Sequence, residues 1–110
     1  MPSQSELRLI KHALEYQEQT ELKEVVPKGT RGIYVLYKRR GAKKARENHY
    51  DVVYIGMTTL GIRGRLQDHV KKMGDLWSHF SMFEVWDNIS DDEIVELEGI
   101  FRHFYPAFLR

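Results

Sequence analysis

The sequence predicts a small α/β (α+β) domain, in which a three-stranded, mainly antiparallel sheet is flanked by helices. Two neighbouring runs of β-branched and aromatic residues predict strands over 32–37 and 50–56, and the single connection between them favours a hairpin. A capping box that begins at Ser90 precedes apolar residues at helical spacing and predicts a final helix. The length of 110 residues and the apolar fraction of 42% suit one core, so we expect a single domain over residues 1–110.

The N-terminal segment also shows helical spacing. Leu7, Ile10 and Leu14 mark one stripe with charged residues between them, which predicts a helix over residues 3–20 with a capping box at Ser3.

The remaining elements follow the two central strands. Residues 57–64 contain two glycines and two threonines and are typical of a loop. Apolar spacing predicts a helix over 65–73, and partial alternation predicts a third strand over 78–86. Pro106 is expected to end the last helix. The predicted order is therefore helix, strand, strand, helix, strand, helix.

The composition excludes several classes of site. The chain has no cysteine, which excludes disulfides, thiolate zinc sites and thiol nucleophiles. No apolar stretch is long enough for a membrane span, and the first residues lack the apolar core of a signal peptide, so we expect a cytoplasmic protein without membrane contact.

The net charge of +1 hides an uneven distribution. Residues 31–75 hold eleven Lys and Arg against four Asp and Glu, whereas residues 76–110 hold two against seven. Residues 1–30 hold four against five. A basic middle segment in a nearly neutral chain points to nucleic acid as a partner.

The two central strands carry Gly32-Ile33-Tyr34 and Tyr54-Ile55-Gly56, and this pair of tripeptides resembles the motifs of the GIY-YIG nuclease family. Further residues follow in the family's order. Arg65 and His69 resemble the Arg-x-x-x-His helix, and Glu98 lies on a final helix that ends near a proline.

The resemblance covers residues 31–106, and residues 1–30 form an N-terminal helical extension outside it. It implies the fold predicted above, a three-stranded antiparallel sheet with helices packed around it. It also implies an activity, the metal-dependent endonucleolytic cleavage of phosphodiester bonds in DNA.

The resemblance assigns a role to each motif residue. It implies that Tyr34 accepts or relays the proton of the attacking water and that Tyr54 orients phosphate or water. A phenol with an ordinary pKa of about 10 is a poor base, and a nearby cation or a metal-bound water could lower the pKa of Tyr34. Arg65 suits the phosphate, and His69 assists the proton transfer, binds phosphate or supports Tyr34. Glu98 holds one Mg²⁺ or Mn²⁺ ion.

Two positions have rivals. Arg63 competes with Arg65 because the loop is one residue longer than in common family members, but the spacing of Arg65 and His69 puts them on one helix face. Glu96 competes with Glu98, because both flank the apolar stripe of the last helix.

The connection between the central strands is long and basic, with twenty positions from Tyr34 to Tyr54. Cations on such a connection suit phosphate contacts, so we expect DNA to bind there and at Arg63. The cations of the connection are Lys38, Arg39, Arg40, Lys43, Lys44 and Arg46.

Two departures from the family pattern bear on function. Many members have an asparagine just after the final proline, and Arg110 stands at about that place here. The missing asparagine favours an alternative function, a nuclease-like module that binds nucleic acid but cleaves it weakly or not at all. The sequence predicts no second DNA-binding domain, so we expect a homodimer or a separate targeting partner. The pattern leaves RNA open as a substrate.

Overall fold

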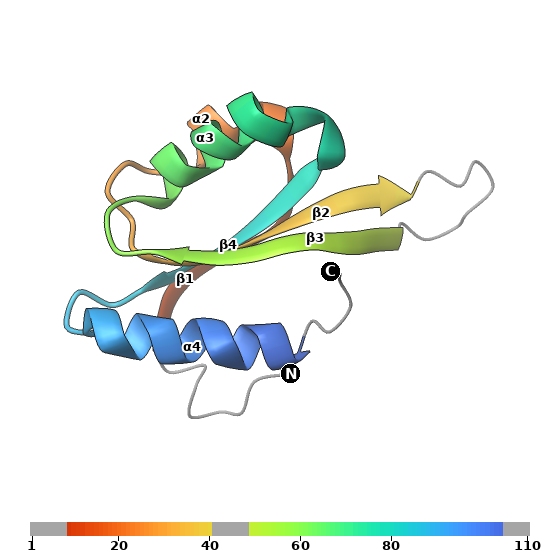
Figure 1. The fold of residues 1–110 in the computed structure, drawn as a ribbon. Helices are drawn as coiled ribbons and strands as arrows, with labels where there is room; N and C mark the ends of the chain where they lie inside the picture. Colours follow the sequence, from red (N-terminus) through yellow and green to blue (C-terminus); the bar gives the residue numbers. More distant parts are fainter. Residues whose placement is uncertain (1–8, 41–48, 105–110) are drawn as a thin grey trace.

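A computed structural model describes residues 9–40 and 49–104, which form a four-stranded antiparallel sheet with helices on both faces (Figure 1). The strands lie in the order β1-β4-β2-β3. They are β1 (Ile10–Glu18), β2 (Gly32–Arg40), β3 (His49–Thr58) and β4 (His79–Val85). The helices are α2 (Leu22–Val25), α3 (Ile62–Met73) and α4 (Asp91–Phe104). The mixed architecture and the antiparallel pairing are confirmed, but the prediction of three strands is one too few.

The extra strand is β1, which replaces the helix predicted over residues 3–20. It pairs antiparallel with β4. Ile10 packs on the α4 side of the sheet and Leu14 on the α3 side. The residues whose spacing predicted one helical stripe therefore lie on opposite faces of the sheet. Two register shifts in the pairing with β4 remove the alternation that marks a regular strand. Ser3 and Leu7 lie outside the described residues.

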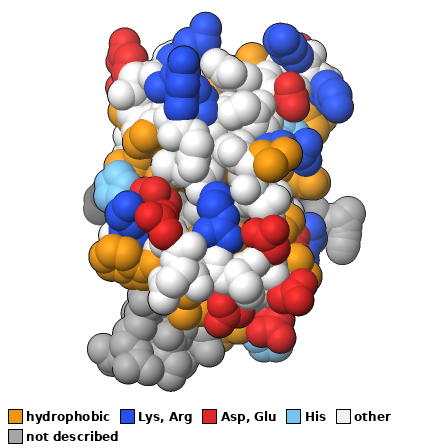
Figure 2. All heavy atoms as spheres, turned by 90° about the vertical axis from the view of Figure 1, so that its left-hand side faces the viewer, with side chains coloured by type: hydrophobic (Ala, Val, Ile, Leu, Met, Phe, Trp, Pro, Cys, Tyr) orange, Lys and Arg blue, Asp and Glu red, His pale blue; other side chains and the backbone are white. Residues whose placement is uncertain are grey.

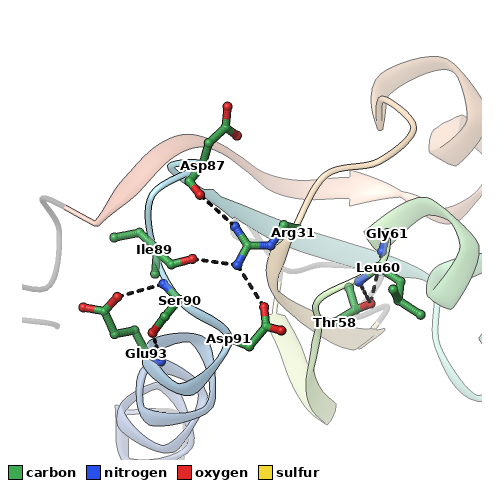
Figure 3. Close-up of polar contacts among 9 residues, drawn as sticks. All are labelled: Arg31, Thr58, Leu60, Gly61, Asp87, Ile89, Ser90, Asp91 and Glu93. Carbon is green, nitrogen blue, oxygen red and sulfur yellow. Dashed lines mark hydrogen bonds and ion pairs between the residues drawn. The ribbon is translucent and has the colours of Figure 1, made fainter.

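The hairpin of β2 and β3 and the strand β4 are confirmed. The loop predicted over 57–64 is shorter, because β3 continues to Thr58 and α3 already begins at Ile62. Thr58 makes this tight connection, since its hydroxyl oxygen accepts hydrogen bonds from the backbone N–H groups of Leu60 and Gly61 (Figure 3). Pro106 lies outside the described residues.

The sheet has two covered faces, which we call the α3 face and the α4 face. Apolar residues of α2 and α3 pack on the first, and apolar residues of α4 pack on the second. The buried core of the α3 face comprises Leu22, Val26, Tyr34, Leu36, Ile62, Leu66, Trp77, Phe80 and Met82. That of the α4 face comprises Ile33, Val35, Tyr37, Ile55, Phe83, Val85, Ile89, Ile94, Leu97 and Phe101.

The capping box at the start of α4 is confirmed. The Ser90 backbone N–H donates to the Glu93 carboxylate at 2.8 Å, and the Glu93 N–H donates to the Ser90 hydroxyl at 3.1 Å (Figure 3). Arg31, at the start of β2, fixes the same end of the helix. Its guanidinium donates to the Ile89 carbonyl at 2.6 Å and to the Asp91 carboxylate at 3.0 Å. These bonds hold α4 beneath β2.

Within residues 9–40 and 49–104, every helix is too short or too polar to cross a membrane.

Candidate functional site

The hydroxyl of Tyr34, on β2, is the point at which the predicted site residues meet. It lies 2.9 Å from Nε2 of His69, on α3. The guanidinium of Arg65, one turn earlier on α3, hydrogen-bonds to the same hydroxyl. The ring of Tyr54, on β3, stacks on that of Tyr34 with 6.1 Å between centroids and lies 4.9 Å from the His69 ring. The structure therefore brings four of the five motif residues together on the α3 face.

The glycines of the two tripeptides explain how this cluster fits. Gly56 lies opposite Tyr34 in the pairing of β2 with β3, and a Cβ atom there would lie 2.5 Å from the Tyr34 hydroxyl oxygen. Gly32 has φ of 153°, and a Cβ atom there would overlap the carbonyl of Phe83. One glycine leaves room for the tyrosine hydroxyl, and the other allows β4 to approach β2.

The helix α3 orients the other two members. Ile62 and Leu66 are fully buried against the sheet, which fixes the rotation of the helix. Arg65 and His69 are four residues apart and project from one side of α3 toward the tyrosines. The predicted common face of these two residues is confirmed.

Burial controls the protonation of the Tyr34 hydroxyl. Tyr34 has 0% of its surface exposed, and the loss of water from the phenolate, assisted by Tyr54, raises its pKa to about 12 against the opposing charge of Arg65. Arg65 acts in the expected direction and lowers this pKa, but desolvation exceeds its attraction, so the pKa stays above its ordinary value.

The pKa of the His69 imidazole shifts in the opposite direction. Burial, followed by the positive charge of Arg65, lowers its pKa below the usual value of 6.5. At neutral pH the ring is therefore uncharged, and Nε2 can accept the proton of the Tyr34 hydroxyl. Tyr54 and His69 are half-buried and Arg65 is exposed, so the cluster opens to solvent on the side of Arg65.

Arg63 has different partners from Arg65. Its Nε donates to the carbonyl of Val26 at 2.7 Å, and its Nη2 donates to the carbonyl of Lys23 at 2.8 Å. These bonds tie α3 to the carbonyl end of α2. Of the two arginines, only Arg65 contacts Tyr34.

Glu98 lies on the α4 face rather than in the tyrosine cluster. Its Oε2 accepts a hydrogen bond of 2.7 Å from Nε of Arg102, whose Nη2 donates to the carbonyl of Ile55 at 2.7 Å. Ile55 lies between Tyr54 and Gly56 on the edge strand β3. The carboxylate is thus connected to the β3 backbone directly behind the cluster. Sequence reasoning missed Arg102, although its spacing of four residues from Glu98 is a recognisable signal.

Glu96 points away from this region. It is exposed and lines an outer hollow of α4 with Ile100 and His103. Glu98 is 17% exposed at its side chain and reaches toward the sheet. Of the two rival carboxylates, Glu98 therefore has the geometry of a group that faces β3.

The side chains near Glu98 determine which metal ion could bind there. Among residues 9–40 and 49–104, no three His, Asp or Glu side chains gather as a metal cage. A lone carboxylate fits Mg²⁺, which keeps several waters and takes further oxygens from phosphate. Oε2 of Glu98 is occupied by Arg102, which leaves Oε1 for such an ion.

The basic connection between β2 and β3 is described only at its start. Nζ of Lys38 donates to the carbonyl of Asp75 at 3.2 Å, and Arg39 is exposed on the neighbouring position. Both lie at the far end of β2 from Gly32. The side chains of the remaining cations of the connection lie outside the described part of the structure. They are Arg40, Lys43, Lys44 and Arg46.

No protein-family model, curated protein or solved structure matches this chain.

Proposed function

We propose that this protein is a metal-dependent endonuclease that hydrolyses phosphodiester bonds in DNA. The observation that carries the proposal is the 2.9 Å contact between the Tyr34 hydroxyl and Nε2 of His69, beside the guanidinium of Arg65. It joins a proton acceptor to a phosphate-binding cation, and phosphodiester hydrolysis needs both. The same residues carry the resemblance to the GIY-YIG nuclease family.

The pKa values support a proton relay rather than a free phenolate. A tyrosine with a pKa of about 12 is almost entirely protonated at neutral pH. In the relay, the attacking water gives its proton to the Tyr34 oxygen while the Tyr34 proton passes to Nε2 of neutral His69. The water oxygen bonds to phosphorus, the bond to the leaving oxygen breaks, and that oxygen takes a proton from solvent.

Arg65 has two roles in this proposal. It interacts with the Tyr34 hydroxyl in the free protein, and its planar fork suits two oxygens of a phosphate. When the guanidinium turns toward phosphate, it releases the hydroxyl for water. Binding of the substrate and release of the base are therefore coupled.

A divalent cation bound at Glu98 would add positive charge to the site from the α4 side of β3, behind the tyrosine cluster. Glu98 would hold this cation, and Arg102, which donates to Oε2, would orient its carboxylate. In an alternative arrangement, the cation would replace Arg102 as the partner of the Glu98 carboxylate.

The test is a cleavage assay with supercoiled, branched and single-stranded DNA, in Mg²⁺, in Mn²⁺ and in EDTA. Wild type should give product only with a divalent cation. Arg65→Ala should lose about 10²-fold to 10³-fold in rate, the usual effect of removing one group that stabilises developing charge. Lys11→Gln, which changes a charge on the distant strand β1, is the matched control and should cleave like wild type.

Glu98→Gln and Glu96→Gln form a second matched pair. Glu98→Gln should reduce the rate strongly and raise the Mg²⁺ concentration needed, while Glu96→Gln should do neither. Equal cleavage by Glu98→Gln and wild type would remove Glu98 from the metal site. Absence of product from wild type with every substrate and cation would refute the nuclease proposal.

One observation favours a second candidate, a module that binds nucleic acid without cleaving it. The ion pair of Glu98 and Arg102, 2.7 Å long, neutralises the carboxylate that a metal would need. This candidate predicts tight DNA binding with no product, and the same wild-type assay separates the two functions.

A further inference from the structure

A groove of about 1060 Å³ lies between α2, the turn that precedes β2, and α3. Its lining is strongly basic. Five cationic side chains line it against the single carboxylate of Asp68. The cations are Lys23, Lys28, Arg63, Arg65 and Lys71.

In the described parts of the chain none of these cations forms an ion pair, although the charge of Asp68 acts on Arg65. The ion pairs among residues 9–40 and 49–104 use Lys11, His12, Arg31 and Arg102 instead. Arg63 donates only to backbone carbonyls, so its charge is not neutralised. Unpaired cations in a concave surface raise the local positive potential and attract anions.

The two ends of the molecule differ in charge. Figure 2 shows most of the visible Lys and Arg side chains over the layer of α2 and α3, with Asp and Glu side chains among them, and a group of Asp and Glu side chains near the start of α4. The first turn of α4 alone carries Asp91, Asp92 and Glu93. A polyanion is therefore guided to the α3 side and repelled from the acidic end of α4.

The groove is continuous with the candidate site through Arg65, which lines the groove and also contacts Tyr34. We infer that this groove binds the sugar–phosphate backbone of the nucleic-acid strand that carries the scissile phosphate, an inference that rests on the proposed nuclease function. Lys23 and Lys28 belong to residues 1–30, outside the segment that resembles the nuclease family. The N-terminal segment is thus part of the substrate surface.

The position of the groove defines a path for the strand. Lys28 lies just before the start of β2, Lys38 lies near its end, and Tyr34 lies between them. A strand from Gly32 to Arg40 spans roughly 26 Å, the length of about eight phosphates along one DNA strand. The groove and Lys38 can therefore contact phosphates on opposite sides of the scissile bond.

The test compares DNA binding by wild type, Lys28→Gln, Lys71→Gln and the double variant. Binding to fluorescent single-stranded and duplex probes is measured in EDTA by anisotropy over a series of KCl concentrations. Each substitution should reduce the slope of log K against log salt by about 1, and the double variant by about 2. The Kd of the double variant should rise by about tenfold or more at ~0.1 M salt. Lys11→Gln, the matched control, should keep the wild-type slope.

The outcomes separate the groove from the nuclease activity. If wild type binds and cleaves DNA but the double variant keeps the wild-type slope, the groove does not bind the DNA backbone. The nuclease proposal is unaffected by that result. A reduced slope with no cleavage by wild type supports the groove and refutes the nuclease. Failure of wild type to bind any probe overturns both.

Discussion

Two clusters of tyrosine and histidine lie on opposite faces of one sheet, and their polar atoms contact different groups. On the α3 face, the Tyr34 hydroxyl contacts the His69 imidazole beside Arg65. On the α4 face, the Tyr37 hydroxyl contacts the Ser81 hydroxyl at 2.9 Å.

The histidine of the second cluster is also bonded to a serine. Nδ1 of His79 lies 2.9 Å from the hydroxyl of Ser78, and the His79 ring packs on Tyr50 at 5.0 Å. A serine hydroxyl satisfies a buried polar group without titrating near neutral pH, whereas an imidazole can take up a proton there. The same residue types therefore support the fold on one face and the proposed proton transfer on the other, and the polar partner makes the difference.

Tyr34→Phe is expected to have the largest effect. It removes the hydroxyl of the proposed relay, so the cleavage rate should fall by about 10²-fold to 10⁴-fold, the usual contribution of a positioned acid or base. Single-turnover cleavage at saturating enzyme measures it, and Tyr37→Phe is the matched control on the other face. Similar rate losses in both variants would show that the two clusters do not differ in function.

The pH dependence of cleavage is expected to follow His69. Burial and the charges of Arg65 and Lys72 lower its pKa, against the opposing charge of Asp68. In the proposed relay neutral His69 accepts the Tyr34 proton, so the rate should be unaffected near pH 7 and should fall as the pH decreases through this lowered pKa, below 6.5. At still lower pH the loss is about tenfold per pH unit, since only the neutral fraction reacts.

The control for this profile is His79, whose pKa burial also lowers. His79→Gln should keep the acid limb of the rate profile, whereas His69→Gln should reduce the rate and flatten the limb. An acid limb that persists in His69→Gln would assign it to another group.

These clusters show how far the sequence predicts the site. The hairpin and α4 were predictable because each carries its own local signal, β-branched runs for the strands and a capping box at Ser90 for the helix. The meeting of Arg65 and His69 on one helix face followed from their spacing. The strand β1 was not predictable, since it pairs with the edge of β4, and its register shifts hide the alternation.

The pKa values and charge pairings of the site were less predictable than the identity of its residues. Whether Arg65 or burial controls the pKa of Tyr34 depends on the packing around the hydroxyl, which no local pattern encodes. The pairing of Glu98 with Arg102 could be read from the helix, but its bond to the carbonyl of Ile55 depends on how α4 lies on the sheet.

Tyr37→Phe should change stability rather than cleavage. It removes the buried hydrogen bond to the Ser81 hydroxyl, so the free energy of unfolding should fall by about 1 kcal/mol. Urea unfolding with a common slope for both proteins measures this loss. Unchanged stability would mean that the contact contributes nothing to the fold, and a lost activity would contradict the structural role of this cluster.

The smallest effect concerns Tyr16, which packs on the same cluster and has φ of 56°. Its ring lies 4.9 Å from that of Tyr37 and 4.7 Å from that of Tyr50, and its backbone N–H donates to the Ser81 hydroxyl at 3.1 Å. These contacts hold a left-handed conformation that costs a non-glycine residue about 1–2 kcal/mol.

Tyr16→Ala and Tyr16→Gly separate the two contributions, because both remove the ring and only glycine relieves the backbone. In most strands glycine is less stable than alanine by about 0.5–1 kcal/mol. At this position we expect the order to reverse, with Tyr16→Gly more stable than Tyr16→Ala by about 1 kcal/mol, while both cleave DNA at the wild-type rate. Urea midpoints of the two variants give the comparison. A lower midpoint for Tyr16→Gly would show that the cluster does not hold its backbone in the left-handed conformation.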